Sequence, residues 1–496
     1  MTHFQIETNQ VARLITDDFR IRNQVAKALT FQLPNFRFTK AHKKNGWDGS
    51  LCFFKRHSST TSTGLIGLAI ENIKKNFGID IPVVDMRKFT PVDPGTAKDI
   101  EGCLAEKTLR DYQVSAVQTI FAKTRGIIQS PTGSGKTVIA AGAVKIANTA
   151  GKKVLFLTHQ KELLYQTHKS FVSSGIDSGI CGDSTKDLNH QTVIATVQTL
   201  FYGLEKKDKR TLRITRPANP EIIALLKSID FLVIDEAHRG DAMSFQAICD
   251  ECSNAYYRIG LTATPLMKGL FEDLALIGQT GEIIFRITIK DLVDRGLLAQ
   301  PYIQFLRITT PLLKQNLQYA TAYKQGIVEN EYRNLLIIDK GVGFARSGLT
   351  TLILVSKINH GKALLHMFSK FSGLKIQFIH GSKDTETRDT ALKALAEKRL
   401  DILISSTISD EGVDIPAVSA VILAGGMKSP IKLYQRIGRG MRPKEDGNWV
   451  LIVDFIDLTN KHLARHSKER FGLIREEPGF EIVPDFNFLL KASAAA

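Results

Sequence analysis

The chain has 496 residues, of which 43% are hydrophobic and 23% charged, and its formal net charge is +16. This length exceeds one hydrophobic core and predicts about three domains. The composition is typical of a globular enzyme and excludes a disulfide scaffold and a membrane helix of roughly 18 apolar residues. We expect no secretory signal, and the positive charge favours a polyanionic partner.

Residues 1–95 predict a small basic domain that recognises a nucleic-acid substrate. Their net charge is +6, and basic residues with interleaved aromatics concentrate between Arg37 and Arg56. We expect two strands, Arg37–Thr39 and Ser50–Phe54, joined by a turn at Asn45–Gly49. This pattern suits contact with a phosphate backbone and stacking on bases, although the aromatics would equally serve as a core. The candidate nucleic-acid contacts are Arg37, Lys43, Lys44 and Trp47.

A glycine-rich stretch opens the second domain, residues 96–305. Ser130–Thr137 spells SPTGSGKT between an expected strand and an expected helix, which is the Walker A pattern with Ser130 in place of its first glycine. Glycines let backbone N–H groups converge on phosphate oxygens, and the helix N-terminus adds partial positive charge. We expect Lys136 to reach the β- and γ-phosphates and Thr137 to bind Mg²⁺. The expected nucleotide-binding residues are Pro131, Thr132, Gly133, Ser134, Gly135, Lys136 and Thr137.

Short apolar runs alternate with helical patterns after this loop, which predicts a parallel sheet. Each run ends in polar residues, and such sheets bind ligands beyond the carboxyl ends of their strands. The expected strands are Val154–Leu157, Val193–Thr196, Phe231–Ile234 and Ile259–Leu261.

Asp235 and Glu236 follow one of these runs in the Walker B arrangement. A carboxylate at Asp235 would hold Mg²⁺ through water, because this small ion keeps most of its hydration shell. Glu236 is the candidate base that orients and deprotonates the attacking water. Upstream, six of the twelve residues Lys206–Pro217 are basic. This segment predicts an inserted loop or hairpin, which either lies on phosphates or is simply solvated.

A second alternation of apolar runs predicts another parallel-sheet domain, residues 348–480, without a phosphate loop of its own. A helical connector, residues 306–347, precedes it, and residues 481–496 form a tail. Arg439 and Arg442 are three residues apart, so they share one face of an expected helix. Two guanidinium groups on one face are able to act on a γ-phosphate as arginine fingers.

The order of these motifs over residues 105–455 resembles that of the superfamily 2 helicases and translocases, with Asp235–His238 as a DEAH-type motif II. The resemblance implies an α/β fold with two tandem RecA-like parallel-sheet domains, preceded by a small α/β DNA-binding domain. It implies ATP and Mg²⁺ as cofactors, with Arg439 and Arg442 as arginine fingers. Further nucleotide contacts would be Gln113, Gly412 and Asp414. Strand contacts would be Thr158, Thr196, Ser356 and Thr407. Residues that couple hydrolysis to movement would be His238, Thr262, Thr264 and Gln435.

The N-terminal block is similar to the small domain of UvsW-type branch-migration helicases of phages. The residues that carry this resemblance are Phe36–Phe38, Gly46–Gly49, Thr63–Gly67 and, further on, Asn330–Asn334. It implies ATP-driven translocation on duplex DNA, with forks and four-way junctions as substrates, in recombination, repair or replication. We expect a monomer in the cytoplasm, which is the host cytoplasm if the gene is phage-encoded. The motor motifs leave two alternatives open, an RNA helicase and a nucleotide-gated clamp that does not travel.

Overall fold

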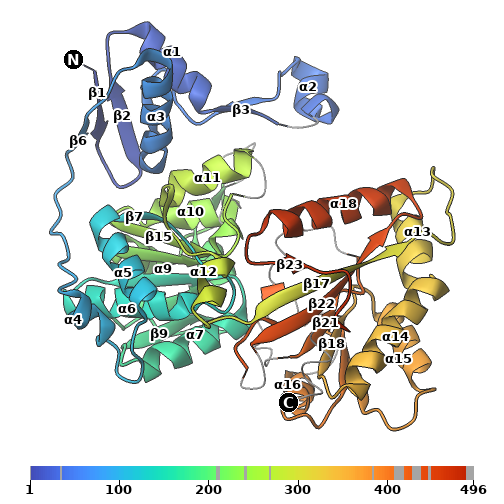
Figure 1. Cartoon of the computed structure of the whole chain (residues 1–496). Helices are drawn as coiled ribbons and strands as arrows, with labels where there is room; N and C mark the ends of the chain where they lie inside the picture. The colour runs from blue at the N-terminus through green and yellow to red at the C-terminus, as the bar shows by residue number, and fades with distance from the viewer. Residues whose placement is uncertain are drawn as a thin grey trace. The chain divides into compact units, whose positions relative to one another are not determined.

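The computed structural model describes residues 2–33, 36–207, 213–239, 243–266, 270–381, 385–406, 418–426, 437–438, 440–444 and 448–487. The chain forms two compact units, residues 1–130 with 135–286, and residues 287–496 with 131–134. Each unit contains a parallel sheet covered by helices, which confirms the predicted α/β class (Figure 1). Within the described ranges, every helix is too short or too polar to span a bilayer.

The N-terminal domain is a four-stranded sheet on which two helices pack, α1 (Phe19–Ala28) and α3 (Ile66–Phe77). The strand order is β5-β2-β1-β6, and only the β1–β6 pair is parallel. Alternate residues of β1 and β2, among them Phe4 and Leu14, are buried against the helices, as the two-residue period of a strand dictates. The strands are β1 (His3–Ile6), β2 (Val11–Ile15), β5 (Thr60–Ser62) and β6 (Val83–Asp85).

An arm of this domain differs from the sequence prediction. The two strands that pair are β3 (Thr30–Gln32) and β4 (Ser50–Cys52), whereas the expected strand Arg37–Thr39 is a helical turn. A six-residue helix, α2 (Lys40–Asn45), follows. Its N-cap Thr39 accepts a hydrogen bond from the His42 N–H, and its C-cap Gly46 has φ +63°, so capping residues override the strand-like alternation. The arm extends away from the four-stranded sheet (Figure 1).

The first core is an eight-stranded sheet in the order β10-β9-β11-β8-β14-β15-β7-β16, in which β10 alone runs antiparallel to its neighbour. All four strands that the sequence predicted are present. The strands are β7 (Arg125–Gln129), β8 (Val154–Thr158), β9 (Ser178–Gly182), β10 (Thr185–Lys186), β11 (Thr192–Thr196), β14 (Phe231–Asp235), β15 (Tyr257–Thr262) and β16 (Ile283–Arg286).

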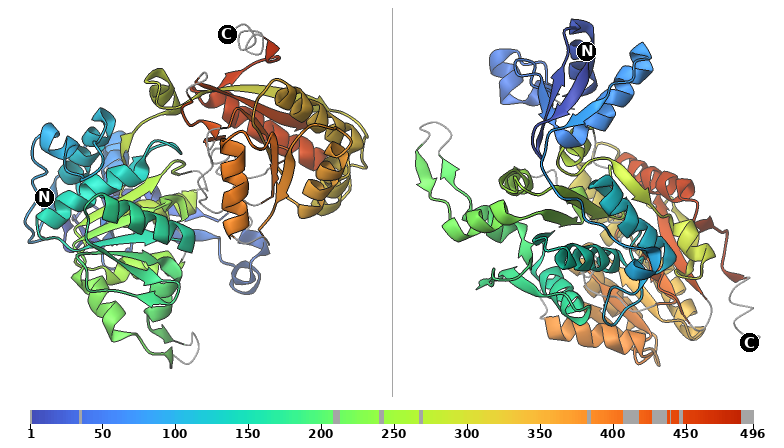
Figure 2. Two further views of the ribbon diagram at one scale, coloured as in Figure 1. Left: turned by 90° about the horizontal axis from the view of Figure 1, so that it is seen from below. Right: turned by 90° about the vertical axis from the view of Figure 1, so that its left-hand side faces the viewer.

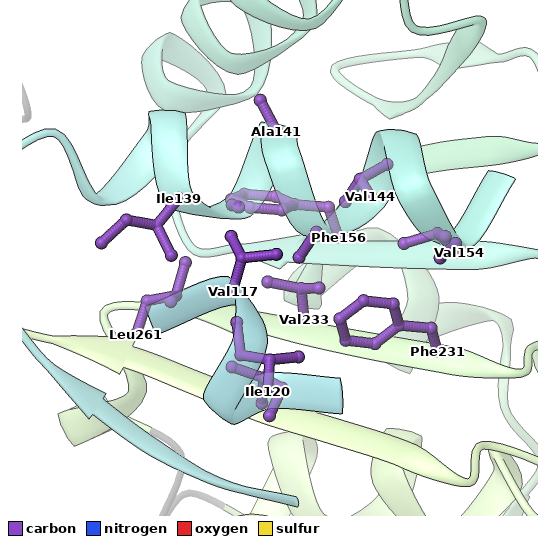
Figure 3. Packing of buried hydrophobic residues seen from close by; sticks show 14 of the residues in the cluster. Val117, Ile120, Ile139, Ala141, Val144, Val154, Phe156, Phe231, Val233 and Leu261 are labelled. Carbon is purple, nitrogen blue, oxygen red and sulfur yellow. The ribbon is translucent and has the colours of Figure 1, made fainter. Parts of the chain in front are cut away.

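Successive residues of the central strands point to two separate hydrophobic clusters. On β8, Val154 and Phe156 join one cluster, and Leu155 and Leu157 join the other. Burial on both faces explains the continuous apolar runs in the sequence. Figure 3 shows the first cluster, where Val117 of α5 lies near the sheet. The helices on the first cluster are α5 (Asp111–Lys123), α6 (Lys136–Thr149) and α7 (Lys161–Ser173), and those on the second are α8 (Val197–Gly203), α9 (Pro220–Ser228) and α10 (Met243–Glu251).

The second unit contains a seven-stranded sheet in the order β19-β20-β18-β21-β22-β17-β23, and all pairs among its described strands are parallel. The strands are β17 (Gln300–Ile308), β18 (Thr351–Leu354), β19 (Ile376–Ile379), β20 (Ile402–Ser405), β21 (Ala420–Ile422), β22 (Trp449–Asp457) and β23 (Glu481–Ile482). Its helices are α12 (Ile289–Asp294), α13 (Tyr319–Tyr323), α14 (Glu331–Arg346), α15 (Ile358–Phe368), α16 (Thr385–Ala396) and α18 (Lys461–Glu476).

Two of the expected domain boundaries fall inside this sheet. The boundary at residue 306 cuts β17, which pairs with β22 over nine residues. Helix α14 of the expected connector contributes Ile337 and Phe344 to the core of the second unit. The expected tail supplies β23, which pairs with β17. The apolar run of β17 was ambiguous in sequence because a buried strand between two domains carries no sign of which sheet it joins.

The N-terminal domain docks on the first core at helix α11 (Leu270–Thr280). Phe271 of this helix lies between Phe31 and Phe53, with ring-centroid distances of 6.2 and 5.6 Å. A side chain on Gly64 would collide with the Ile277 carbonyl oxygen, so the two backbones approach closely at this point. On the neighbouring helix α10, the Gln10 amide donates to the Cys249 carbonyl at 3.1 Å. The segment Thr63–Gly67, which carried part of the family resemblance, therefore forms the seam between the domains.

We predict from this close approach that Gly64→Ala destabilises the first unit. The added methyl group would collide with a backbone carbonyl, which cannot move aside as a flexible side chain would. Overpacking of this kind costs about 1–3 kcal/mol. Chemical denaturation and limited proteolysis between residues 62 and 97 would measure the effect. Gly102→Ala is the control, since a Cβ there has only an ordinary contact of 3.7 Å. Equal stability of the two variants would contradict the close packing of the seam.

Candidate active site

The carboxyl ends of five neighbouring strands form one line along the first core. Thr196 of β11 pairs in register with Thr158 of β8, Asp235 of β14 pairs with Leu261 of β15, and Thr262 pairs with Gln129 of β7. Strands lie about 4.8 Å apart, so the line from Thr196 to Gln129 is about 19 Å long. Residues that sequence analysis assigned to nucleotide lie at the β7 end, and those assigned to a nucleic-acid strand lie at the β11 end.

The loop between β7 and α6 has the backbone of a phosphate cradle. Gly133 and Gly135 have φ values of +86° and +83°, a region that favours glycine. Helix α6 begins at Lys136 with Gly135 as its N-cap, so its first N–H groups have no side-chain cap. Uncapped amides at a helix N-terminus bind anions. Ser130, the departure from the strict pattern, is buried and donates its N–H to the Thr262 carbonyl at 3.0 Å.

Lys136 and Gln113 lie against this loop. The Lys136 ammonium donates to the Ser130 carbonyl at 3.3 Å, which bends its side chain back over the loop. Gln113 is buried, and its Oε1 accepts the Arg110 N–H at 2.9 Å. A Cβ on Gly135 would come within 2.6 Å of the Gln113 Nε2, so the glutamine side chain lies directly behind the glycine. Gln113 and Gly135 therefore depend on each other for their positions.

Asp235 and Glu236 place two carboxylates at the end of β14. Burial and repulsion from Glu236 raise the pKa of Asp235 to about 7, although Lys136 opposes the shift. Glu236 has φ +48°, a strained value for this residue. Two adjacent carboxylates near a lysine and a phosphate cradle suit a divalent cation, which would relieve their repulsion. The donor set therefore fits a nucleotide phosphate with Mg²⁺, held by Lys136, Thr137 and Asp235.

A chain of contacts leads from Glu236 to the next strand. The Glu236 Oε2 lies 3.2 Å from the His238 Nδ1, which lies 3.1 Å from the Thr262 Oγ1. The Thr262 hydroxyl in turn accepts the Thr264 N–H at 3.1 Å. All three coupling residues that the sequence predicted in this core are thus in one network with the candidate base. A change in the position or charge of Glu236 would therefore alter the contacts of Thr262 on β15, the strand that pairs with β7.

The predicted strand contacts of the first core are buried. Thr158 is fully buried, and Thr196 is the N-cap of α8, with its Oγ1 accepting the Thr199 N–H at 3.4 Å. The hydroxyls of Thr158 and Thr264 make no hydrogen bond to the described residues, a state that a bound polar group would relieve. The geometry places these residues at the expected edge, and their contact with a nucleic-acid strand stays a prediction.

On the N-terminal arm, Arg37, Lys43 and Lys44 are exposed, as phosphate contacts require. Trp47 is half-buried, and its indole N–H donates to the Ser50 carbonyl at 3.1 Å. This bond ties Trp47 to the arm itself. Phe38 is the aromatic side chain most open to solvent on the arm, at 77% exposure.

In the second unit, Ser356 is exposed and donates to the Gly425 carbonyl at 3.3 Å. Arg442 is half-buried, and this burial lowers the pKa of its guanidinium. The remaining predicted residues of this unit lie outside the described residues: Thr407, Gly412, Asp414, Gln435 and Arg439.

Comparison with known proteins places both cores in helicase families. Residues 106–267 match the family model "Type III restriction enzyme, res subunit", and residues 334–444 match "Helicase conserved C-terminal domain". A putative helicase of a Sulfolobus islandicus filamentous virus is 28% identical over 90% of this chain and 79% of its own. The ATP-dependent DNA helicase uvsW of Enterobacteria phage T4 is 24% identical over 89% of this chain and 88% of its own.

The chain belongs to the superfamily 2 helicases. It is accordingly an ATP-hydrolysing helicase with two RecA-like domains. Among solved structures, a putative HsdR subunit of a type I restriction enzyme from Vibrio vulnificus has the same fold. The TM-score is 0.55 at 18% identity, covering 88% of this chain and 78% of that one.

The structure of this helicase adds a cluster that sequence analysis did not predict. Arg333 is fully buried; its Nε donates to Asp457 at 2.8 Å and its Nη1 to the Ala424 carbonyl at 2.6 Å. The Tyr323 hydroxyl donates to the next carbonyl, that of Gly425, at 2.6 Å. Two helices, α13 and α14, thus hold the turn after β21, on which Ser356 also acts. The pentapeptide Asn330–Asn334 contained the signal, but its partners lie far away in sequence.

The shifted pKa of Asp235 predicts a pH-dependent stability that Asp235→Asn removes. Between its ordinary pKa near 4 and about pH 7, the folded state holds this proton more tightly than the unfolded state. The contribution of Asp235 to the free energy of unfolding therefore falls as pH rises through this window. The stability of Asp235→Asn relative to the wild type should rise with pH, by at most about 1.4 kcal/mol per unit.

Denaturant titrations at several pH values, without nucleotide or divalent cation, would measure this difference. Glu106→Gln removes an exposed carboxylate from the same unit and should follow the wild-type profile. A difference between Asp235→Asn and the wild type that stays constant from pH 4 to 7 would contradict the raised pKa.

Proposed function

We propose that this helicase is an ATP-driven DNA translocase that acts on branched DNA, with forks and four-way junctions as its substrates. The observation that supports the proposal is the single line of strand ends: the residues predicted to bind nucleotide, here called the nucleotide half, and those predicted to contact a nucleic-acid strand share one sheet edge. The relative uvsW is described as an ATP-dependent DNA helicase and matches 89% of this chain. The net charge of +16 favours a polyanionic substrate.

In this proposal each residue of the nucleotide half has one task. Lys136 and the uncapped amides of α6 bind the phosphates, and Thr137 and Asp235 hold Mg²⁺. When bound, Mg²⁺ neutralises phosphate charge. Glu236 orients the attacking water and accepts its proton. Protonation of Glu236 would then alter its 3.2 Å contact with His238, and a movement of His238 would alter its hydrogen bond with Thr262.

The N-terminal domain would supply the preference for branched DNA. It packs on α11, the helix that follows the Thr262–Thr264 segment in the chain. A substrate bound to the basic arm would therefore act on a helix that is close in sequence to the candidate active site. The arm offers exposed Arg37, Lys43 and Lys44 to phosphates. We propose that the protein binds duplex arms without sequence preference, as a monomer.

Migration of a synthetic four-way junction tests the proposal. The wild type should convert the junction to linear duplexes with ATP but not with a non-hydrolysable analogue. Lys136→Ala should bind the junction with wild-type affinity and hydrolyse no ATP, because the phosphates lose their ammonium contact.

Each alternative predicts a different result in this assay. An RNA helicase would show ATPase stimulation by single-stranded RNA and not by the junction. A clamp would bind the junction in response to either nucleotide and move nothing. Substantial ATP turnover by Lys136→Ala would contradict the assignment of the phosphate site.

Arg442 would act on the γ-phosphate from the second unit, together with Arg439. Arg442→Ala should retain nucleotide binding and lose hydrolysis by about a thousandfold or more, as removal of an arginine finger does. A fluorescent nucleotide and steady-state ATPase rates would separate the two effects. Arg346→Ala, which removes an exposed arginine at the end of α14, is the control and should hydrolyse ATP at the wild-type rate. Loss of nucleotide binding by Arg442→Ala would show that this residue only supports affinity or structure.

A further inference from the structure

The basic insert between α8 and α9 is a hairpin with a firm base. Strands β12 (Lys206–Lys207) and β13 (Ile214–Arg216) pair antiparallel, with Lys206 opposite Arg216 and a register shift beside it. The Thr215 hydroxyl donates to the Lys206 carbonyl at 3.0 Å, which closes the base further. Both views of Figure 2 show this green hairpin standing out from the first unit.

Arg216 attaches the hairpin to helix α8 through hydrogen bonds. Its Nη2 donates to the carbonyls of Phe201 and Leu204 at 2.9 and 3.2 Å, and its Nε donates to Leu204 at 3.3 Å. Its guanidinium carbon also lies 5.0 Å from the centre of the Tyr202 ring. Both carbonyls lie at the end of α8, and that of Phe201 also accepts the Leu204 N–H at 3.2 Å. The direction of the hairpin is therefore set by α8.

The exposed side chains at the end of α8 and at the base of the hairpin combine positive charge with apolar surface. Tyr202 and Ile214 are 69% and 56% exposed, although both are large and apolar. Lys206 and Arg213 are exposed beside them. Basic groups next to an exposed aromatic ring are the pattern of a surface that binds nucleic-acid backbone and stacks on bases.

Helix α8 also connects the hairpin to the strand-binding half of the sheet edge. Thr196 is its N-cap and Arg216 satisfies its last carbonyls, so the helix is held at both ends. Seven residues of α-helix span about 10 Å, which corresponds to about three nucleotides of one DNA strand. A strand bound at Thr196 would thus reach the hairpin within a few nucleotides.

We propose that the β12–β13 hairpin is a second nucleic-acid contact that grips the phosphate backbone of the duplex next to the motor strand. The proposal rests on the proposed function and adds to it a site, with Lys206 and Arg213 as phosphate contacts. A grip at this point would hold the duplex arm while the strand-binding edge moves.

The salt dependence of DNA binding tests this site. Each duplex phosphate contact contributes about 0.9 to the slope of log affinity against log salt. Removing two charges with the double variant Lys206→Gln and Arg213→Gln should therefore reduce the slope by about 1 to 2 between about 50 and 200 mM salt. Junction DNA with a fluorescent label is the probe, and a wild-type melting temperature would show that the variant is folded.

The matched control is Lys123→Gln with Lys227→Gln, which removes two exposed charges from helices α5 and α9 of the same unit. Its slope should stay at the wild-type value. A second variant, Arg216→Lys, keeps the positive charge but loses the planar guanidinium that donates to the carbonyls at the end of α8. It should weaken junction binding without an equal reduction in the slope of log affinity against log salt.

Three outcomes separate the two proposals. A reduced slope for the double variant alone supports the hairpin contact. Unchanged slopes in both double variants, with junction-stimulated ATPase in the wild type, overturn the hairpin contact and leave the proposed function in place. A wild type that neither binds the junction nor responds to it in ATPase rate overturns both.

Discussion

The start of helix α6 carries amide groups that no side chain of the helix satisfies, and this constraint organises the first unit. Gly133 and Gly135 aim those amides by adopting positive φ values. The Gln113 side chain lies so close to Gly135 that a Cβ there would have no room. The Ser130 N–H then ties the loop to the Thr262 carbonyl, so the phosphate cradle and the coupling strand share one hydrogen bond. Helix N-termini of this kind favour an anion or water in front of them.

Parallel pairing extends this arrangement along the sheet edge. In a parallel sheet every carboxyl end lies on the same side, and the register here aligns Thr196, Thr158 and Asp235 within one residue of each other. Thr158 thereby becomes a neighbour of Thr196, 38 positions away, and of Asp235, 77 positions away. Thr262 connects the two sites, since its hydroxyl lies within hydrogen-bond distance of His238 and its carbonyl accepts the Ser130 N–H of the phosphate loop. In the proposed function, hydrolysis and strand binding would be linked through strands whose interiors are fully buried, and closely packed strands transmit small displacements.

Sequence predicted these parts because their signals are local. A strand buried on both faces is a continuous apolar run, and a phosphate loop is a contiguous motif. The Arg333 cluster was not predictable in the same way, since its partners lie 91 and 124 residues further along the chain. Burial among such partners lowers the pKa of the neighbouring His360 to about 3, so its ring is neutral in the fold. The first strand of the arm, Arg37–Thr39, was predicted wrongly because this stretch alternates like a strand, whereas the deciding signals were the caps Thr39 and Gly46. The second, Ser50–Phe54, contains β4. Short helices depend more on their caps than on periodicity.

The two attachments of the first core follow one principle. The N-terminal domain is seated on α11, which follows Thr264 in the chain, and the hairpin is seated on α8, which begins at Thr196. Each attachment thus contacts a helix just downstream of a residue at the functional edge, and neither is carried by an element remote from it. A displacement of Thr196 or Thr262 during the ATPase cycle would move the corresponding helix and its attachment together. Since both attachments are basic, such a displacement would move two contacts with a polyanion at separate points on the first unit.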